Sequence, residues 1–160
     1  MASDDTAVRE HLQRALAWED AHATFDKAVH GIPVDKRGSR AAGFEHSPWQ
    51  LVEHIRLAQD DILDFCVNSK YVHSLKWPDD YWPKDPAPPS VAAWDASVAA
   101  ALETRERFKQ LAREIPDLGA RVPTGTDQQT YLRALLLVVD HNAYHVGQLV
   151  AVRKALGIWG

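Results

Sequence analysis

The sequence is poor in cysteine, and it lacks both an excess of basic residues and a long apolar run. Its single cysteine, Cys66, excludes an intrachain disulfide and is typical of proteins in a reducing compartment. A formal charge of -4 at pH 7 argues against binding to nucleic acid through bulk positive charge. The longest apolar run, Ala134–Val139, is far shorter than the roughly 20 residues of a membrane-spanning helix.

The first residues, MASDDTAVREHLQ, lack the basic and apolar regions of a signal peptide. These absences predict a cytoplasmic protein without a nucleic-acid or membrane partner. The composition that is present, with 46% hydrophobic and 25% charged residues, is that of a globular protein. We therefore expect residues 1–160 to form a single domain with a sizeable core.

Four long segments repeat apolar residues at steps of three and four, which is the spacing of an amphipathic helix. Four helices of this length in one domain predict an all-α fold, namely a four-helix bundle. Outside these segments, only the residues around Ala120–Pro123 are a candidate for a short extended piece. The predicted helices are about Thr6–Val29, a segment from Pro48 whose apolar stripe reaches Phe65, Val91–Glu114 and about Gln128–Leu156.

Capping residues mark the ends of three of these helices. In SPWQ, Ser47 can be the N-cap, Pro48 suits the first helical position, and Gln50 completes a capping box. Ser90 can cap the third helix, and Gly157 is a natural residue at the end of the fourth. The second helix is therefore the element with the clearest predicted start.

The segment Trp77–Ser90, WPDDYWPKDPAPPS, contains five prolines and is predicted to be irregular. Three aromatic residues, Trp77, Tyr81 and Trp82, distinguish it from a plain flexible linker. A long loop with its own packing groups can cap the end of a bundle or cover a pocket as a lid. We favour the structural cap and keep the substrate-facing lid as the alternative.

The last predicted helix contains HNAYHVGQLV, in which His141 and His145 share one helical face. His54 lies on the flank of the apolar stripe of the second helix, so three imidazoles converge if these helices are neighbours. Three neutral nitrogen ligands and an open position describe a catalytic-type site for Zn²⁺, and also for Ni²⁺ or Fe²⁺. For each histidine alone, a hydrogen bond within the core is the competing interpretation.

Other metal motifs fit this sequence poorly. A zinc-protease helix needs Glu directly after the first His of the pair, where this chain has Asn142. A di-iron bundle needs Glu-x-x-His on two helices, and Glu19–His22 is the one pair with that spacing. Glu53 and Asp140 each precede a proposed ligand and point about 100° away from it, so we expect them to pair between helices or face solvent.

Three further residues are candidates to support the site. Gln148 lies about one turn after His145 and can contact a metal-bound water. Asp61 lies near the same face as His54, but two turns away along the helix. His22 can reach the pocket from the first helix, although a hydrogen-bonded core histidine is the simpler interpretation.

Three segments together resemble the DinB-like superfamily (DinB/YfiT) of four-helix-bundle metalloenzymes. They are HSPWQLVEHIRLAQDDIL, WPDDYWP and DHNAYHVGQLVAVRKALGIW, and the resemblance in helix order covers nearly the whole chain. It implies an up-down-down-up bundle with a long crossover. It also implies a divalent metal bound by His54, His141 and His145, and a homodimer, which is common in the superfamily.

The resemblance extends to classes of function. Characterised relatives include thiol-dependent S-transferases, a mycothiol-dependent isomerase and a hydrolase of a reactive small molecule. It therefore implies a metal-dependent enzyme with a small-molecule substrate, and we favour an S-transferase that uses a low-molecular-weight thiol against small electrophiles or toxins. The alternatives are a metal-dependent hydrolase, a non-catalytic stress-response binding module, and a structural bundle with hydrogen-bonded histidines.

Overall fold

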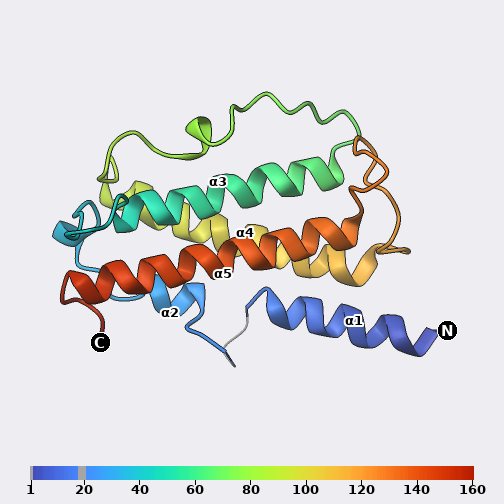
Figure 1. The fold of residues 1–160 in the computed structure, drawn as a ribbon, viewed down its shortest axis with the longest axis horizontal. Helices are drawn as coiled ribbons and strands as arrows, with labels where there is room; N and C mark the ends of the chain where they lie inside the picture. Colours follow the sequence, from blue (N-terminus) through green and yellow to red (C-terminus); the bar gives the residue numbers. More distant parts are fainter. Residues whose placement is uncertain (1, 18–20) are drawn as a thin grey trace.

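The structure, a computed structural model, describes residues 2–17 and 21–160, and its regular elements are helical (Figure 1). The prediction of an all-α chain is confirmed. The predicted extended piece at Ala120–Pro123 amounts to an isolated antiparallel bridge between Arg121 and Thr130. The helices of the described chain are α1 (Ala2–Ala15), α2 (Phe25–Val29), α3 (Pro48–Val67), α4 (Val91–Glu114) and α5 (Tyr131–Ala155), with single 3-10 turns η1 (Val34–Lys36) and η2 (Asp79–Tyr81).

Helix α3 packs against both α4 and α5 along most of its length (Figure 1). Helix α1 contacts α4 and α5, and the short α2 contacts α5. One core cluster joins α3 to α5 around Val52, Ile55 and Leu149, and a second contains Phe108 and Leu135. Burial of these apolar side chains fixes one face of α3 against α5, and that face carries His54.

The predicted caps of α3 and α4 are confirmed. The Ser47 hydroxyl accepts a hydrogen bond from the Gln50 N–H at 3.2 Å, and Gln50 Oε1 accepts one from the Ser47 N–H, so the capping box is complete. Ser90 caps α4, which spans the predicted residues. Helix α5 begins three residues later than predicted, because the Thr130 hydroxyl caps it by accepting from the Arg133 N–H.

The prediction of one continuous helix over Thr6–Val29 is wrong, because α1 and α2 are separate elements. Helix α2 begins after its own N-cap at Thr24, whose hydroxyl accepts a hydrogen bond from the Lys27 N–H at 3.2 Å. The predicted apolar stripe included two polar residues, Glu19 and His22, so it offered little burial to carry one helix through this segment. Glu19 lies outside the described residues.

The proline-rich loop Trp77–Ser90 runs along α3 and is tied to the start of that helix (Figure 1). The Ser47 hydroxyl donates a hydrogen bond to the carbonyl oxygen of Pro86, and Gln50 Nε2 donates to that of Pro83 at 2.9 Å. The residues of the capping box therefore hold the loop as well as the helix. The structural-cap interpretation of this loop is incomplete, because two of its tryptophans also line a pocket.

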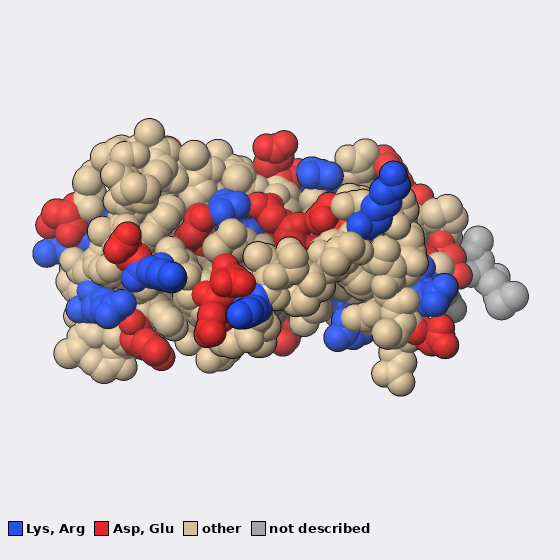
Figure 2. Space-filling view, turned by 90° about the horizontal axis from the view of Figure 1, so that it is seen from above, with Lys and Arg blue, Asp and Glu red and all other residues tan. Residues whose placement is uncertain are grey.

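The charged side chains are mixed in sign on the face shown in Figure 2. Acidic and basic residues are interspersed there, and no continuous basic area is visible on this face. Within the described residues, no helix is both long and apolar enough to cross a membrane.

Candidate metal site and its pocket

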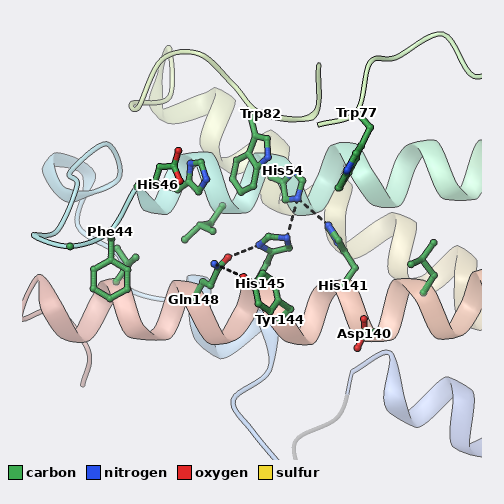
Figure 3. A pocket seen from close by; sticks show the side chains of 15 residues that line it. Phe44, His46, His54, Trp77, Trp82, Asp140, His141, Tyr144, His145 and Gln148 are labelled. Atoms are coloured by element: carbon green, nitrogen blue, oxygen red, sulfur yellow. Dashed lines mark hydrogen bonds between the residues drawn. The ribbon is translucent and has the colours of Figure 1, made fainter. Parts of the chain in front are cut away.

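Three histidine side chains meet where α3 packs against α5 (Figure 3). His54 comes from α3, and His141 and His145 come from successive turns of α5. The Nε2 atom of His54 lies 3.0 Å from that of His141 and 3.1 Å from that of His145. The structure therefore brings together the three imidazoles that the sequence singles out.

Burial disfavours the protonated form of all three imidazoles. His54 is 1% exposed and His145 is 7% exposed, while His141 is half-buried. Burial lowers the pKa of His54 to about 3 and the pKa of His145 to about 4, and it also lowers the pKa of His141. A neutral imidazole is the form that can bind a metal ion through a ring nitrogen.

Hydrogen bonds to the outer ring nitrogens fix the tautomers of two of these histidines. The Nδ1 of His54 lies 2.9 Å from the carbonyl oxygen of Tyr81, which can only accept. The Nδ1 of His145 lies 2.7 Å from the side-chain oxygen of Gln148. Each Nδ1 therefore carries the proton, and each Nε2 presents a lone pair to the centre of the cluster.

The lone pairs of His54 and His145 point toward each other across 3.1 Å. Two acceptors at this separation repel unless a positively charged or electron-poor atom lies between them. Imidazole nitrogens that share one metal ion at about 2.0–2.1 Å are themselves about 3 Å apart. The residues present therefore fit a bound divalent cation in donor type, and the two distances from His54 fit its spacing.

The outer nitrogen of His141 has a different environment. Its Nδ1 is buried and lacks a hydrogen-bond partner, and the side-chain oxygen of the adjacent Asn142 is also buried without one. In the tautomer that leaves Nε2 of His141 free, its Nδ1 carries the proton and is a donor. The Asn142 oxygen is an acceptor, so a small rotation would allow a hydrogen bond between the two side chains. Asn142 is thus the residue best placed to orient His141.

Trp82 covers the cluster from the loop. Its ring stacks on that of His54 with centroids 3.8 Å apart and planes 3° apart (Figure 3). On its other side, His46 stacks on Trp82 with centroids 3.7 Å apart and planes 11° apart. This stack of three rings shields His54 from water, which is one physical reason for its low pKa.

The cluster opens into a pocket with a volume of about 560 Å³. This volume lies within the roughly 300–1,000 Å³ of sites that bind small molecules. The walls come from the segment before α3, from the proline-rich loop and from α5 (Figure 3). Besides the histidines and Trp82, the pocket is lined by Phe44, Leu51, Trp77, Leu137, Tyr144 and Gln148, among others.

The sequence-family model of the DinB superfamily matches residues 17–149, which is most of the chain. The chain belongs to the DinB superfamily. The matched region includes all three histidines and Gln148, but it leaves out α1. No curated protein matches the sequence.

In this DinB-superfamily chain, Asp61 does not reach the histidines. Seven residues of helix place it roughly 10 Å along the axis from His54. Its carboxylate instead accepts hydrogen bonds from the hydroxyls of Tyr71 at 2.9 Å and Tyr81 at 2.6 Å. Because the Tyr81 carbonyl oxygen accepts from His54, Asp61 acts on the cluster only through the position of Tyr81.

His22 also lies away from the cluster. It is exposed in the segment before α2, where its Nδ1 is 2.9 Å from the carbonyl oxygen of Ala23, and it borders a separate cavity of about 30 Å³. Neither predicted role, at the pocket or in the core, fits that position. The expectation for the two carboxylates is confirmed, because Glu53 pairs with Ser97 of α4 and Asp140 is exposed.

Sequence reasoning missed several residues that the structure places at the pocket. His46 and Tyr144 line it, and the carbonyl of Tyr81 orients His54. The density of aromatic residues in WPDDYWP was the available signal for the loop wall. His46 gave no periodic signal, because it lies in the irregular segment before α3.

Proposed function

We propose that this DinB-superfamily protein is a divalent-metal-dependent enzyme for a small molecule, with His54, His141 and His145 as the metal ligands. The observation that supports this most is the pair of Nε2 lone pairs facing each other across 3.1 Å at the end of a pocket. When bound, a divalent ion on three imidazoles supplies Lewis acidity toward a water or a thiol. Zn²⁺, Ni²⁺ and Fe²⁺ all suit such a ligand set.

The protein groups around the cluster have separate tasks in this proposal. The Tyr81 carbonyl and Gln148 hold two imidazoles in the tautomer that binds metal. Trp82 keeps water from the buried side of His54. The pocket walls then receive the substrate beside the open side of the cluster.

For the reaction, we propose S-transfer from a low-molecular-weight thiol to an electrophile such as an epoxide or an alkyl halide. The thiol sulfur bonds to the electrophilic carbon, and the carbon–oxygen or carbon–halogen bond breaks. The thiol proton goes to the oxygen of the opened epoxide or leaves with the halide. Support for this reaction over hydrolysis comes from the resemblance to thiol-dependent relatives.

Metal content is the first test. We expect purified protein, or metal-free protein supplied with Zn²⁺ or Ni²⁺, to hold about one ion per chain by elemental analysis. His141→Ala should lose the ion, whereas His11→Ala, a change at an exposed histidine on α1, should keep it. Wild-type protein that takes up no divalent ion would refute the metal site.

The reaction is tested by ligand-induced stabilisation. A thiol among bacillithiol, mycothiol and glutathione that raises the melting temperature of only the metal-loaded protein supports S-transfer. Metal binding without any thiol effect would favour the hydrolase, to be checked with ester and amide substrates. Ligand binding that persists in metal-free His141→Ala would favour a non-catalytic binding module.

A further inference from the structure

The charged residues that line the pocket are all acidic. Glu45 and Asp140 line it, and no Lys or Arg is found among its described lining residues. Both residues are exposed, so they belong to the part of the lining that is open to solvent. Glu45 directly precedes His46 and Asp140 directly precedes His141, so each acidic residue is the chain neighbour of a pocket histidine.

The same pocket holds two aromatic side chains that are left open to solvent. Trp77 is 62% exposed and Tyr144 is 63% exposed, and no other aromatic residue of the described chain is exposed. The Trp77 ring lies 6.1 Å from that of His54, and the Tyr144 ring lies 4.9 Å from that of His145 (Figure 3). One comes from the loop and the other from α5, so the two flank the histidine cluster.

This combination has a chemical meaning for the substrate. Exposed aromatic faces bind flat apolar groups and attract cations, because the face of the ring is electron-rich. Carboxylates attract cations and repel anions. A carboxylate, phosphate or sulfonate on the substrate would find no basic side chain among the lining residues with which to pair.

A bound divalent ion does not reverse this expectation. The two carboxylates carry a formal charge of -2, so an ion of charge +2 brings the lining to about zero rather than to a positive value. An anion could then be held only by direct contact with the ion itself. The pocket walls still offer it no positive partner.

We propose that the pocket selects small aromatic molecules without negative charge, held between Trp77 and Tyr144, with Glu45 and Asp140 disfavouring anions. This proposal rests on the proposed function in placing the substrate at this pocket, and it adds the substrate class.

The test uses three probes that share a benzyl group and coordinate metals weakly. They are benzyltrimethylammonium, benzyl alcohol and phenylmethanesulfonate, titrated by calorimetry into metal-loaded protein. We expect the cation to bind about five-fold or more tightly than the sulfonate, with the alcohol between them, as aromatic and carboxylate attraction predicts. Equal or tighter binding of the sulfonate would overturn the proposal.

Variants test whether the preference for the cationic probe over the sulfonate depends on the acidic and aromatic side chains of the pocket. The double variant Glu45→Gln/Asp140→Asn should bring the ratio of the two dissociation constants toward one, whereas Asp127→Asn, at an exposed carboxylate outside the pocket, should leave it unchanged. A ratio that the double variant leaves intact would contradict the proposal. Trp77→Leu should weaken the binding of all three probes, and Trp77→Phe should restore most of it.

Elemental analysis of each variant separates the two proposals. If wild-type protein binds no metal but still prefers the cation, the proposed function fails and the charge selection stands. If the metal is bound and the preference is absent, the charge selection fails and the metal site stands. Unchanged melting temperatures for Trp77→Leu and the double variant show that the fold is intact.

Discussion

Two polar clusters lie on different faces of α3, and their hydrogen bonding differs. The first, which we call the acidic cluster, faces α4 and contains the carboxylates of Glu53 and Asp60. Arg56 donates hydrogen bonds to Glu53 at 2.9 Å and to Asp60 at 2.8 Å. Ser97 and Thr104 of α4 donate to the same two carboxylates at 2.6 and 2.7 Å. The histidine cluster facing α5 instead brings nitrogen lone pairs against each other.

Structural and functional polar groups differ in whether the chain itself supplies all their hydrogen-bond partners. In the acidic cluster, every contact joins a donor to an acceptor, so the network stabilises the packing of α3 on α4 without any further partner. In the histidine cluster, the outer nitrogens of His54 and His145 are satisfied, whereas their inner nitrogens face each other as two acceptors. A buried group whose partner must come from outside the chain is a candidate for ligand binding.

The largest effect that we expect comes from the histidine cluster. A metal ion at 100 to 1,000 times its dissociation constant stabilises the folded state by about 3–4 kcal/mol. Addition of the ion should therefore raise the melting temperature of the wild type and of Ser97→Ala, but not of His54→Ala. Differential scanning fluorimetry measures this, and an equal rise in His54→Ala would place the ion elsewhere.

A smaller effect is expected when the acidic cluster is broken. Arg56 and Ser97 both donate to the Glu53 carboxylate, and Glu53→Ala removes this shared acceptor. We expect the free energy of unfolding to fall by about 1–3 kcal/mol. Urea unfolding measures this cost, and Glu103→Ala, at an exposed site on α4, is the control. Metal affinity should stay as in the wild type; its loss in a folded Glu53→Ala protein would show that the two clusters are coupled.

One hydrogen bond of the acidic cluster can be removed at nearly constant shape. Thr104 is 5% exposed, and its hydroxyl donates a hydrogen bond to Asp60. The substitution Thr104→Val removes this hydroxyl. We expect a loss of about 1 kcal/mol in the free energy of unfolding, because Arg56 still pairs with Asp60. Thr104→Ser keeps the hydroxyl and should unfold closer to the wild type, and a valine variant that is equally stable would argue against this hydrogen bond.

The smallest effect belongs to an ion pair at the surface, between Asp26 of α2 and Arg105 of α4. The hydrogen bond from Arg105 lowers the pKa of Asp26, although the carboxylate is about half exposed. The stabilisation is therefore present above the ordinary pKa of an aspartate, near 4, and is lost as the pH falls through the lower folded value. Asp26→Asn should lower the melting temperature slightly at pH 7 and by less at pH 3, since exposed pairs contribute at most about 1 kcal/mol and the contribution falls with the pH.

The elements that the sequence predicts well are those with a local cause. The capping box at Ser47 and Gln50 defines the start of α3 from adjacent residues alone, and Ser90 does the same for α4. The convergence of His54 with His141 and His145 follows from helical periodicity once α3 and α5 are neighbours. For these features, residues a few positions apart determine the geometry.

The features that sequence reasoning missed depend on contacts between distant segments. The stack of His46, Trp82 and His54 brings together an irregular segment, a loop and a helix, and no period relates their positions. Asp61, by contrast, was a candidate that the structure places away from the site. It shares a helical face with His54, but two helical turns separate the two residues along the axis. Direction around a helix is readable from sequence, whereas distance to a site requires the packed structure.

The attachment of the proline-rich loop has a consequence for how this pocket can be altered. The carbonyl oxygens of Tyr81, Pro83 and Pro86 accept hydrogen bonds from α3 or from its cap, and main-chain acceptors are present whatever the side chain. The side chains of Trp77 and Trp82 are therefore replaceable without loss of these anchors. Such a wall is suited to evolutionary divergence and to library design, in which new specificities are sought while the metal ligands stay in place.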